Sequence, residues 1–500
     1  MADETVTAGR GVIYIALAKL YFMVAGYAIY FSLPRLLGSE VLWGNYLLVV
    51  GLVSIIDNVI VTGTIQGVSK FTAQDDTLAD GVKRAALKVQ VVLGGGLAAL
   101  YVGSAPLIAS WERDPGLTSL YRLSAGIMLC YAFYAVFVGS LNGLRRFGRQ
   151  ASLDVSFATL RAALILGAAA AGWGVAGAIG GFVSAAFIIL VVSVVVVRLP
   201  RGEARFPARE IWMFMLQLFV YTFALNMIMR VDLFLLKRLV GELSGLTDVV
   251  ARAELASAFS GYYGTAQSLA FIPYQAILAV AFVIFPLVSR STFEDDLATT
   301  QAYVRQTLRL SLIFVVGVAV VFMANPEAVI AVPYPAKYRI GGPALRVLSA
   351  GMVCFSMFTI INTILNGAGR THLTIISGVT TFGLAAVSNW LLIPHAGTPE
   401  DALVWAAYAS SASMAVGMIL SAALLYREFR AGFPALSLIR TALALAAMLG
   451  LGTVIPEVSK LVTLGECILI FVAFFVVLVV TREFKAEDVA KFKRVFSRGR

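Results

Sequence analysis

The sequence is poor in charge, histidine and cysteine. Of its 500 residues only 13% are charged, whereas 60% are hydrophobic. A soluble protein of this length places far more charge on its surface, so a large soluble core is excluded. The two histidines and the three scattered cysteines show no metal-ligand or disulfide spacing, so no metal site is indicated. No Gly-Lys dipeptide occurs, which excludes a Walker A loop and ATP-driven transport by this chain alone.

Long apolar runs are what the sequence has in place of charge. Fourteen segments can be recognised, at about 11–33, 41–65, 85–109, 119–141, 152–172, 175–197, 211–236, 254–288, 306–324, 343–365, 372–394, 402–425, 438–455 and 463–481. Most approach or exceed the ~20 residues that a helix needs to cross a bilayer. We therefore expect an all-α polytopic membrane protein with about 14 transmembrane helices. Segment 254–288 is too long for one straight span, and Pro273 and Pro286 predict a bend in it.

The distribution of basic residues predicts the orientation. With the N-terminus inside, 26 Lys and Arg residues fall in the inside loops and the tail, and ten fall in the outside loops. This imbalance predicts that both termini are cytoplasmic. It also accounts for the net charge of +11 through contact with anionic lipid, without a nucleic-acid partner. The basic tail, residues 483–500, has the spacing of an amphipathic helix lying on the inner leaflet.

An internal repeat divides the chain. Leu141-Asn142-Gly143-Leu144-Arg145-Arg146 matches Leu365-Asn366-Gly367-Ala368-Gly369-Arg370 at an offset of 224 residues. Six spans separate the two copies, so the halves share one orientation, as in transporters with parallel repeats. We predict two six-helix bundles, residues 1–200 and 201–430, two extra transmembrane helices in 431–482, and the tail.

Ionisable residues inside apolar segments are functional candidates because they are costly there. They are Lys19, Asp57, Asp154, Arg161, Arg230 and Asp232. Arg161 lies close to the predicted midplane and Arg230 close to an outer end. Structural alternatives stay open, because Asp154 and Arg161 share a helical face and could pair. Lys19 could likewise reach Asp57.

Two polar stripes accompany these charges. Thr222, Asn226, Arg230 and Lys237 share one face of the seventh segment, and Ser260, Tyr263, Gln267 and Tyr274 share one face of the eighth. Amide and aromatic groups on a cavity wall suit sugar rings and hydroxyls. Ordinary packing between helices suits them equally well.

Short motifs in fixed order carry a family resemblance. They are Arg35-Leu36-Leu37-Gly38 followed by Gly44-Asn45-Tyr46, then Val231-Asp232, Gly261-Tyr262-Tyr263, Phe285-Pro286-Leu287-Val288-Ser289, Asn366-Gly367-Ala368-Gly369-Arg370 and Asn389-Trp390-Leu391-Leu392-Ile393-Pro394. The ordered set resembles the polysaccharide flippase branch of the multidrug/oligosaccharidyl-lipid/polysaccharide exporter superfamily. The resemblance implies two bundles around a central cavity that opens alternately to the two sides of a bacterial inner (plasma) membrane.

The resemblance also implies a function. We expect a non-enzymatic flippase that translocates a polyprenyl-diphosphate-linked oligosaccharide. Lys19, Arg161 and Arg230 would hold the diphosphate, with Asn226, Tyr263 and Gln267 on the cavity wall. Asp57 or Asp154 would couple the cycle to a proton or sodium gradient or to the membrane potential, without any cofactor.

Other functions stay open at this point. A lipid II flippase, an ion-coupled multidrug exporter and a membrane glycosyltransferase or ligase are the alternatives. The short loops disfavour the enzyme, and the equal numbers of embedded cations and anions disfavour the exporter of cations. A polysaccharide polymerase and glycosyltransferases are the expected protein partners.

Overall fold

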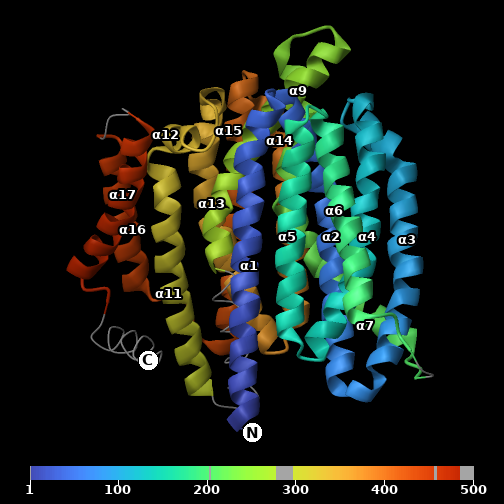
Figure 1. Ribbon diagram of the computed structural model, residues 1–500. Helices are drawn as coiled ribbons and strands as arrows, with labels where there is room; N and C mark the ends of the chain where they lie inside the picture. The colour runs from blue at the N-terminus through green and yellow to red at the C-terminus, as the bar shows by residue number, and fades with distance from the viewer. Residues whose placement is uncertain (1, 202–203, 278–296, 455–458, 485–500) are drawn as a thin grey trace. The chain divides into compact units, whose positions relative to one another are not determined.

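The computed structural model describes residues 2–201, 204–277, 297–454 and 459–484. These ranges contain α-helices and short 3-10 helices and no strand (Figure 1). Thirteen helices within them are long and apolar enough to cross a membrane. The predicted all-α, polytopic architecture of about 14 helices is confirmed. The basic tail from residue 485 onward lies outside the described residues.

The chain forms two compact units, residues 1–261 and 262–500, and each is described by itself. The division into segments at 200, 430 and 482 stays a prediction. Helix α9 (Val249–Ala270) contributes to both units. It ends at a turn at Phe271, two residues before Pro273, and a second helical stretch follows at 272–277. The predicted interruption therefore lies at the first of the two prolines, and Pro286 lies outside the described residues.

The first unit is a bundle of long helices followed by short ones. Its further elements are α1 (Ala2–Leu37), α2 (Glu40–Gln74), η1 (Asp76–Leu78), α3 (Ala79–Trp111), η2 (Pro115–Leu117), α4 (Thr118–Gly143), α5 (Phe147–Ala170), α6 (Gly174–Val197), α7 (Ala208–Ile228), α8 (Val231–Leu239) and η3 (Val240–Ser244). Helix α1 packs mainly against α5, α2 against α4 and α7, and α6 against α4 and α5. Sequence neighbours α1 and α2 make much less contact.

The predicted seventh span is broken into α7 and α8. Met229 and Arg230 form the turn, in which the backbone N–H of Arg230 donates to the carbonyl of Met227 at 3.1 Å. Arg230 then precedes α8 as its N-cap residue with φ −138°. The polar stripe predicted on one continuous helix face is therefore interrupted between Asn226 and Lys237. That part of the prediction is wrong, because the stripe needs an unbroken helix.

Two motif glycines let α2 and α9 touch backbone to backbone. A Cβ at Gly44 would overlap the carbonyl group of Ser257. A Cβ at Gly261 would lie 2.6 Å from the carbonyl oxygen of Glu40. Glycine is required at both positions because any side chain would push the helices apart. The neighbouring Trp43 is fully buried and stacks on Tyr46 at 5.7 Å between ring centroids.

The second unit has a core of apolar and neutral polar residues. Its further elements are α11 (Leu297–Ala324), α12 (Pro326–Ala331), η4 (Ala336–Gly341), α13 (Gly342–Gly367), α14 (Thr371–Leu392), η5 (Ile393–His395), α15 (Pro399–Phe429), α16 (Ala435–Gly452) and α17 (Lys460–Val480). Helix α13 packs on α11 and α15, and α15 packs on α14. Helices α16 and α17 pack on α11 and on each other.

One buried carboxylate fastens the last two helices to this unit. Glu483, just after α17, accepts hydrogen bonds from the side chains of Arg309 on α11 at 2.7 Å and Arg440 on α16 at 3.1 Å. Ser437 donates a third bond at 2.6 Å. These donors lower the pKa of Glu483 despite its burial. The two helices outside the repeat are thus held by an ion-pair network as well as by apolar packing.

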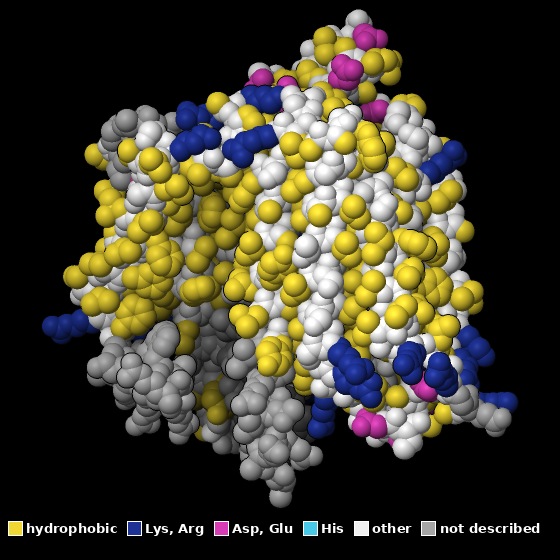
Figure 2. Space-filling view, in the orientation of Figure 1, with side chains coloured by type: hydrophobic (Ala, Val, Ile, Leu, Met, Phe, Trp, Pro, Cys, Tyr) yellow, Lys and Arg dark blue, Asp and Glu magenta, His cyan; other side chains and the backbone are white. Residues whose placement is uncertain are grey.

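The helix flanks are apolar and the helix ends are charged. Figure 2 shows hydrophobic side chains over the middle of the helices, with Lys and Arg gathered near their ends. Val92, Leu107 and Val195, for example, are 70% to 73% exposed. Such a surface suits lipid as its solvent.

Candidate functional site

An ion pair joins α1 to α5 within the apolar part of the first unit. The ammonium of Lys19 lies 3.4 Å from Oδ2 of Asp154. The lysine side chain is 62% exposed and the aspartate side chain 9%. Near this pair the hydroxyls of Tyr21 and Thr159 are 2.9 Å apart and link the same two helices. The pair therefore presents its cationic member at the surface of the bundle and its anionic member toward the interior.

Arg161 lies two turns further along α5, where it packs against aromatic rings. Its guanidinium carbon is 4.5 Å from the ring centroid of Phe22 on α1 and 5.6 Å from that of Phe182 on α6. Its Nε is buried without a hydrogen-bond partner among the described residues. Arg161 also interacts with the hydroxyl of Tyr131 on α4. Cation–π contacts hold the plane of a guanidinium without using its N–H groups, so those not bonded to Tyr131 can bind an anion.

The two structural pairings that the sequence left open are not found among the described residues. Asp154 pairs with Lys19 rather than with Arg161. Lys19 does not pair with Asp57, because α1 packs along α5 and only slightly on α2. The depths of Lys19 and Asp57 in their spans suggested that they could meet, but depth does not determine which helices are neighbours. The structure thus pairs Lys19 with Asp154 and places Arg161 two turns further along the same contact between α1 and α5.

Asp57 lies apart from this cluster, in the interior of the first unit. Its side chain is buried, and Oδ1 has no hydrogen-bond partner among the described residues. It interacts electrostatically with Tyr101 on α3 and Tyr131 on α4. A buried carboxylate without a strong donor is the kind of group that exchanges a proton or binds a cation during a cycle. Its role in coupling stays a prediction.

The residues predicted on α7 and α8 have different environments. Asn226 accepts a hydrogen bond from Nδ2 of Asn58 on α2 at 2.9 Å and donates to the carbonyl of Thr222 at 2.8 Å. These bonds satisfy most of its side chain and fasten α7 to α2. Arg230 stands at the break before α8, half-buried. The two residues do not join the Lys19 and Arg161 cluster through any contact that the structure describes.

Tyr263 and Gln267 on α9 are fully buried, at 0% and 1% exposed. Both have interactions with neighbouring groups, so in this conformation they are part of the packing between helices. Their placement on a cavity wall stays a prediction. Among the described residues no group of histidine, cysteine and acidic side chains could hold a metal ion.

A second charged site, not predicted from the sequence, lies where α3 ends against α8 and α9. The ammonium of Lys237 is fully buried and donates to Oδ2 of Asp114 at 2.8 Å, to the carbonyl of Ala253 at 2.9 Å and to Oγ of Ser257 at 2.6 Å. Three acceptors saturate the three N–H groups of an ammonium. Burial lowers the pKa of Lys237, and Asp114 opposes that shift.

Glu112 completes this second site. It is 2% exposed, and Oε2 accepts a hydrogen bond from the hydroxyl of Tyr121 at 2.7 Å. Burial raises the pKa of Glu112 to about 7, although Tyr121 and Lys237 act to lower it. Sequence reasoning counted the surrounding cations only as outside-loop charges. The sequence signal for this site is the concentration of these basic residues in two of the outside loops, because the outside loops otherwise contain few Lys and Arg residues.

Comparison with known proteins gives a family match and several matches of fold. A family model described as polysaccharide biosynthesis protein matches residues 47–340. No match was found among curated protein sequences. The fold is similar to that of the lipid II flippase MurJ in an inward closed conformation, with a TM-score of 0.73 at 14% identity over 94% of this chain and 99% of that chain.

Two other solved structures extend the fold comparison. A transporter of the MOP superfamily from Pyrococcus furiosus has a TM-score of 0.62 at 16% identity, covering 85% of this chain and 95% of its own. An outward-facing multidrug transporter of the MATE family has a TM-score of 0.59 at 15% identity, covering 84% and 96%. At these identities the likeness establishes the fold alone.

Proposed function

Because this chain belongs to the polysaccharide biosynthesis protein family, we propose that it is a flippase for a polyprenyl-diphosphate-linked oligosaccharide. The observation that carries the proposal is the cluster on α1 and α5. Lys19 and Arg161 place two cations inside apolar helices, while only one carboxylate, Asp154, lies within ion-pair distance of either among the described residues. The cluster therefore has one positive charge in excess, which a phosphorylated headgroup would neutralise.

The chemistry of the cluster suits a diphosphate more than a neutral sugar. Charge-assisted bonds from guanidinium and ammonium to phosphate oxygens are strong in a low-dielectric environment. The planar guanidinium of Arg161 can bind two oxygens at once, whereas Lys19 acts as a point charge that also exchanges with Asp154. Sugar rings would contact the neighbouring aromatic side chains, such as Phe22, and the lipid tail would stay in the bilayer.

Alternating access supplies the movement in this proposal. The cargo binds to one conformer better than to the other and shifts the population between them. A difference of a few kcal/mol is enough, and a cation or proton bound at Asp57 would bias the return step. Both termini would be cytoplasmic in the inner membrane, as the basic residues predict. A polysaccharide polymerase and glycosyltransferases would act on the same glycan.

A reconstitution experiment tests the flippase function directly. Proteoliposomes containing the full chain are formed with a fluorescent polyprenyl-diphosphate-linked disaccharide in both leaflets, and dithionite quenches the probe that reaches the outer leaflet. Protein-dependent loss of protected fluorescence is expected, with Arg122→Gln as the matched control because Arg122 is exposed and lies outside the cluster. Equal kinetics in vesicles with and without the protein would overturn the proposal.

Lipid II is the second candidate cargo. The similarity to the lipid II flippase MurJ over 94% of this chain favours it. Both cargoes carry a polyprenyl diphosphate, so the cluster itself does not separate them. The intermediate that accumulates in a depleted strain does: a lipid-linked polysaccharide unit supports the first candidate, and a lipid-linked peptidoglycan precursor supports the second.

A further inference from the structure

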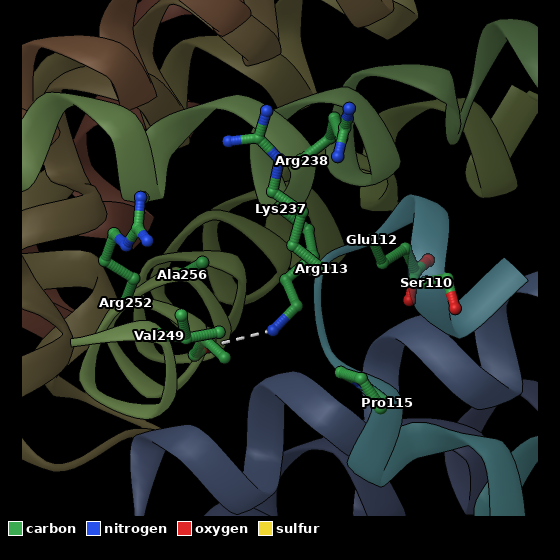
Figure 3. A pocket seen from close by; sticks show the side chains of 11 residues that line it. Ser110, Glu112, Arg113, Pro115, Lys237, Arg238, Val249, Arg252 and Ala256 are labelled. Atoms are coloured by element: carbon green, nitrogen blue, oxygen red, sulfur yellow. Dashed lines mark hydrogen bonds between the residues drawn. The ribbon is translucent and has the colours of Figure 1, made fainter. Parts of the chain in front are cut away.

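A pocket of about 490 Å³ opens where the end of α3 meets α8 and α9 in the first unit. Figure 3 shows Arg252 on one side of Lys237 and Glu112 on the other, with Arg238 above Lys237. Its lining comprises Ser110, Glu112, Arg113, Pro115, Lys237, Arg238, Gly241, Val249, Arg252, Ala253 and Ala256. Four of these residues are cations, and Glu112 is the one acid among the described lining residues.

Two of the four cations have carboxylate partners. Lys237 is saturated by Asp114, Ser257 and a backbone carbonyl, so it contributes to the framework rather than to binding. Arg113 forms an ion pair with Glu242 in η3. The charges of Lys237 and Arg113 are therefore already neutralised by Asp114 and Glu242.

The other two cations, Arg238 and Arg252, have no carboxylate partner among the described residues. Among the described residues neither Arg238 nor Arg252 forms an ion pair, and the Nε of each is buried without a hydrogen-bond partner. Arg238 stacks on Trp111 at 5.9 Å, a contact that orients the guanidinium without using its N–H groups. Buried N–H donors without acceptors are costly, because they have lost water and gained nothing in return. The pocket therefore presents fixed donors that an anion would satisfy.

Electrostatics favour a ligand with more than one negative charge. Burial has the largest effect on the pKa of Arg238 and lowers it, and repulsion from Arg113 lowers it further. The carboxylate of Glu242 partly offsets this shift. Near neutral pH Glu112 is partly protonated, since its pKa is about 7. The pocket is then left with an excess of positive charge that its own acids do not balance. Arginine forks match tetrahedral oxyanions, because two parallel N–H groups can bind two oxygens.

We propose that this pocket is a second anion site, separate from the Lys19 and Arg161 cluster, and that it binds a phosphate or diphosphate group through Arg238 and Arg252. Its volume is sufficient for a phosphorylated headgroup. In the predicted orientation the pocket lies at the extracytoplasmic end of the bundle. The ligand chemistry could come from a lipid headgroup or from free phosphate. The site does not depend on the nature of the flipped cargo.

Titration of the purified full chain tests the proposal. Inorganic pyrophosphate is titrated in detergent by isothermal calorimetry, and the same protein is placed in nanodiscs with or without farnesyl diphosphate. Arg252→Gln and Arg238→Gln are each expected to weaken pyrophosphate binding about tenfold or more, as loss of a bidentate charged contact predicts. Arg122→Gln, an exposed arginine outside the pocket, is expected to bind like the wild-type protein. Thermal unfolding confirms that each variant is folded.

The arms of the experiment separate the outcomes. Binding of both pyrophosphate and farnesyl diphosphate, each weakened by the two variants, supports a lipid-headgroup site. Binding of pyrophosphate alone supports a free-phosphate site. Binding that is unchanged in folded Arg238→Gln and Arg252→Gln, or absent in the wild-type protein, overturns the proposal. Lys19→Gln should lower flipping while it leaves pyrophosphate binding at this pocket intact, so the two proposals fail independently.

Discussion

The two units of this protein hold their helices together with different chemistry. In the first, ionisable side chains lie between helices, as Lys19 and Asp154 do. Among α13, α14 and α15 of the second unit, amides and hydroxyls take that place, whereas the charged Glu483 network lies at the end of α17. Nδ2 of Asn362 on α13 lies 3.4 Å from Oγ of Ser421 on α15, and its Oδ1 accepts from Ser377 on α14 at 3.0 Å. Nδ2 of Asn389 donates to Ser410 at 3.0 Å.

The repeat makes the contrast sharper. At the offset of 224 residues, Arg161 and Asp154 correspond to Ala385 and Gly378. The turns before these helices are alike, because the backbone N–H of Arg146 donates to Leu141 at 2.8 Å and that of Arg370 to Leu365 at 2.9 Å. A common scaffold thus carries charge in one copy and small residues in the other. We infer that the first unit contributes the binding chemistry and the second a stiff neutral framework.

The largest expected effect is that of removing the charge from Arg161. Arg161→Gln should slow flipping by about a hundredfold, because it removes a charged bidentate contact worth a few kcal/mol. Protein abundance should stay within about twofold, since no carboxylate is left unpaired. Dithionite quenching in proteoliposomes measures the rate and immunoblotting measures abundance. Loss of abundance together with normal flipping per molecule would assign Arg161 to packing alone.

The Lys19 and Asp154 pair should separate function from stability. Lys19→Gln should slow flipping about tenfold and lower the melting temperature, because it leaves the carboxylate of Asp154 without its partner. Adding Asp154→Asn should restore the melting temperature but not the flipping rate. A double-mutant cycle on both readouts tests this. Recovery of flipping in the double variant would show that the pair acts only in stabilising α1 on α5.

In the second unit the opposite pattern is expected. Asn362→Ala removes partners of Ser377 and Ser421 and should lower the free energy of unfolding by about 2 kcal/mol. Flipping per folded molecule should remain at the wild-type level. Thermal unfolding and the quenching assay measure the two quantities. A selective loss of flipping at unchanged stability would contradict the division of labour between the units.

The raised pKa of Glu112 predicts that the stability of the protein depends on pH. Because its folded pKa, about 7, lies above the ordinary value of 4.5, the folded protein binds the extra proton more tightly than the unfolded chain. This contribution is fully present below about pH 4.5 and is lost as pH rises through 7. Glu112→Gln should flatten the decline in melting temperature between pH 5 and pH 8, while Tyr121 keeps a hydrogen-bond acceptor. An unchanged pH profile would place the titration elsewhere.

The smallest effects are expected in the repeated turns. Arg145 has φ +55° and Gly369, at the same place in the second copy, has φ +76°. Gly369→Ala should destabilise the protein by about 1 kcal/mol, and Arg145→Gly should be neutral or stabilising by a similar amount. Chemical unfolding of both variants measures the two changes in the free energy of unfolding. Changes in stability of the same sign would show that backbone strain differs between the two turns, although both turns have equivalent hydrogen bonds.

Much of the fold follows from the sequence because a bilayer leaves few options. Apolar length alone predicts the helices, and the match of the family model confirms the family that the ordered motifs indicated. The four-residue echo between Asn142 and Asn366 corresponds to equivalent turns. Which helices become neighbours is a different matter. It depends on surface complementarity between segments far apart in sequence, such as α1 and α5.

The candidate site was predicted only in part for the same reason. Depth in the membrane singles out Lys19, Asp154 and Arg161, but partner choice requires knowing that α1 lies on α5. The break after Ile228 has no strong sequence signal, since neither proline nor glycine occurs there. The pocket around Arg238 and Arg252 needs three chain segments that meet only in space. Loop cations are too common in membrane proteins to reveal such a meeting.

The contact between Gly44 and Gly261 has a practical consequence for anyone who would introduce a probe into this protein. This contact is made by backbone atoms of both helices, so it cannot be relaxed by trimming a side chain and can only be forced open by adding atoms. A cysteine, label or cross-linker introduced there would wedge the helices apart and report on the damage it caused.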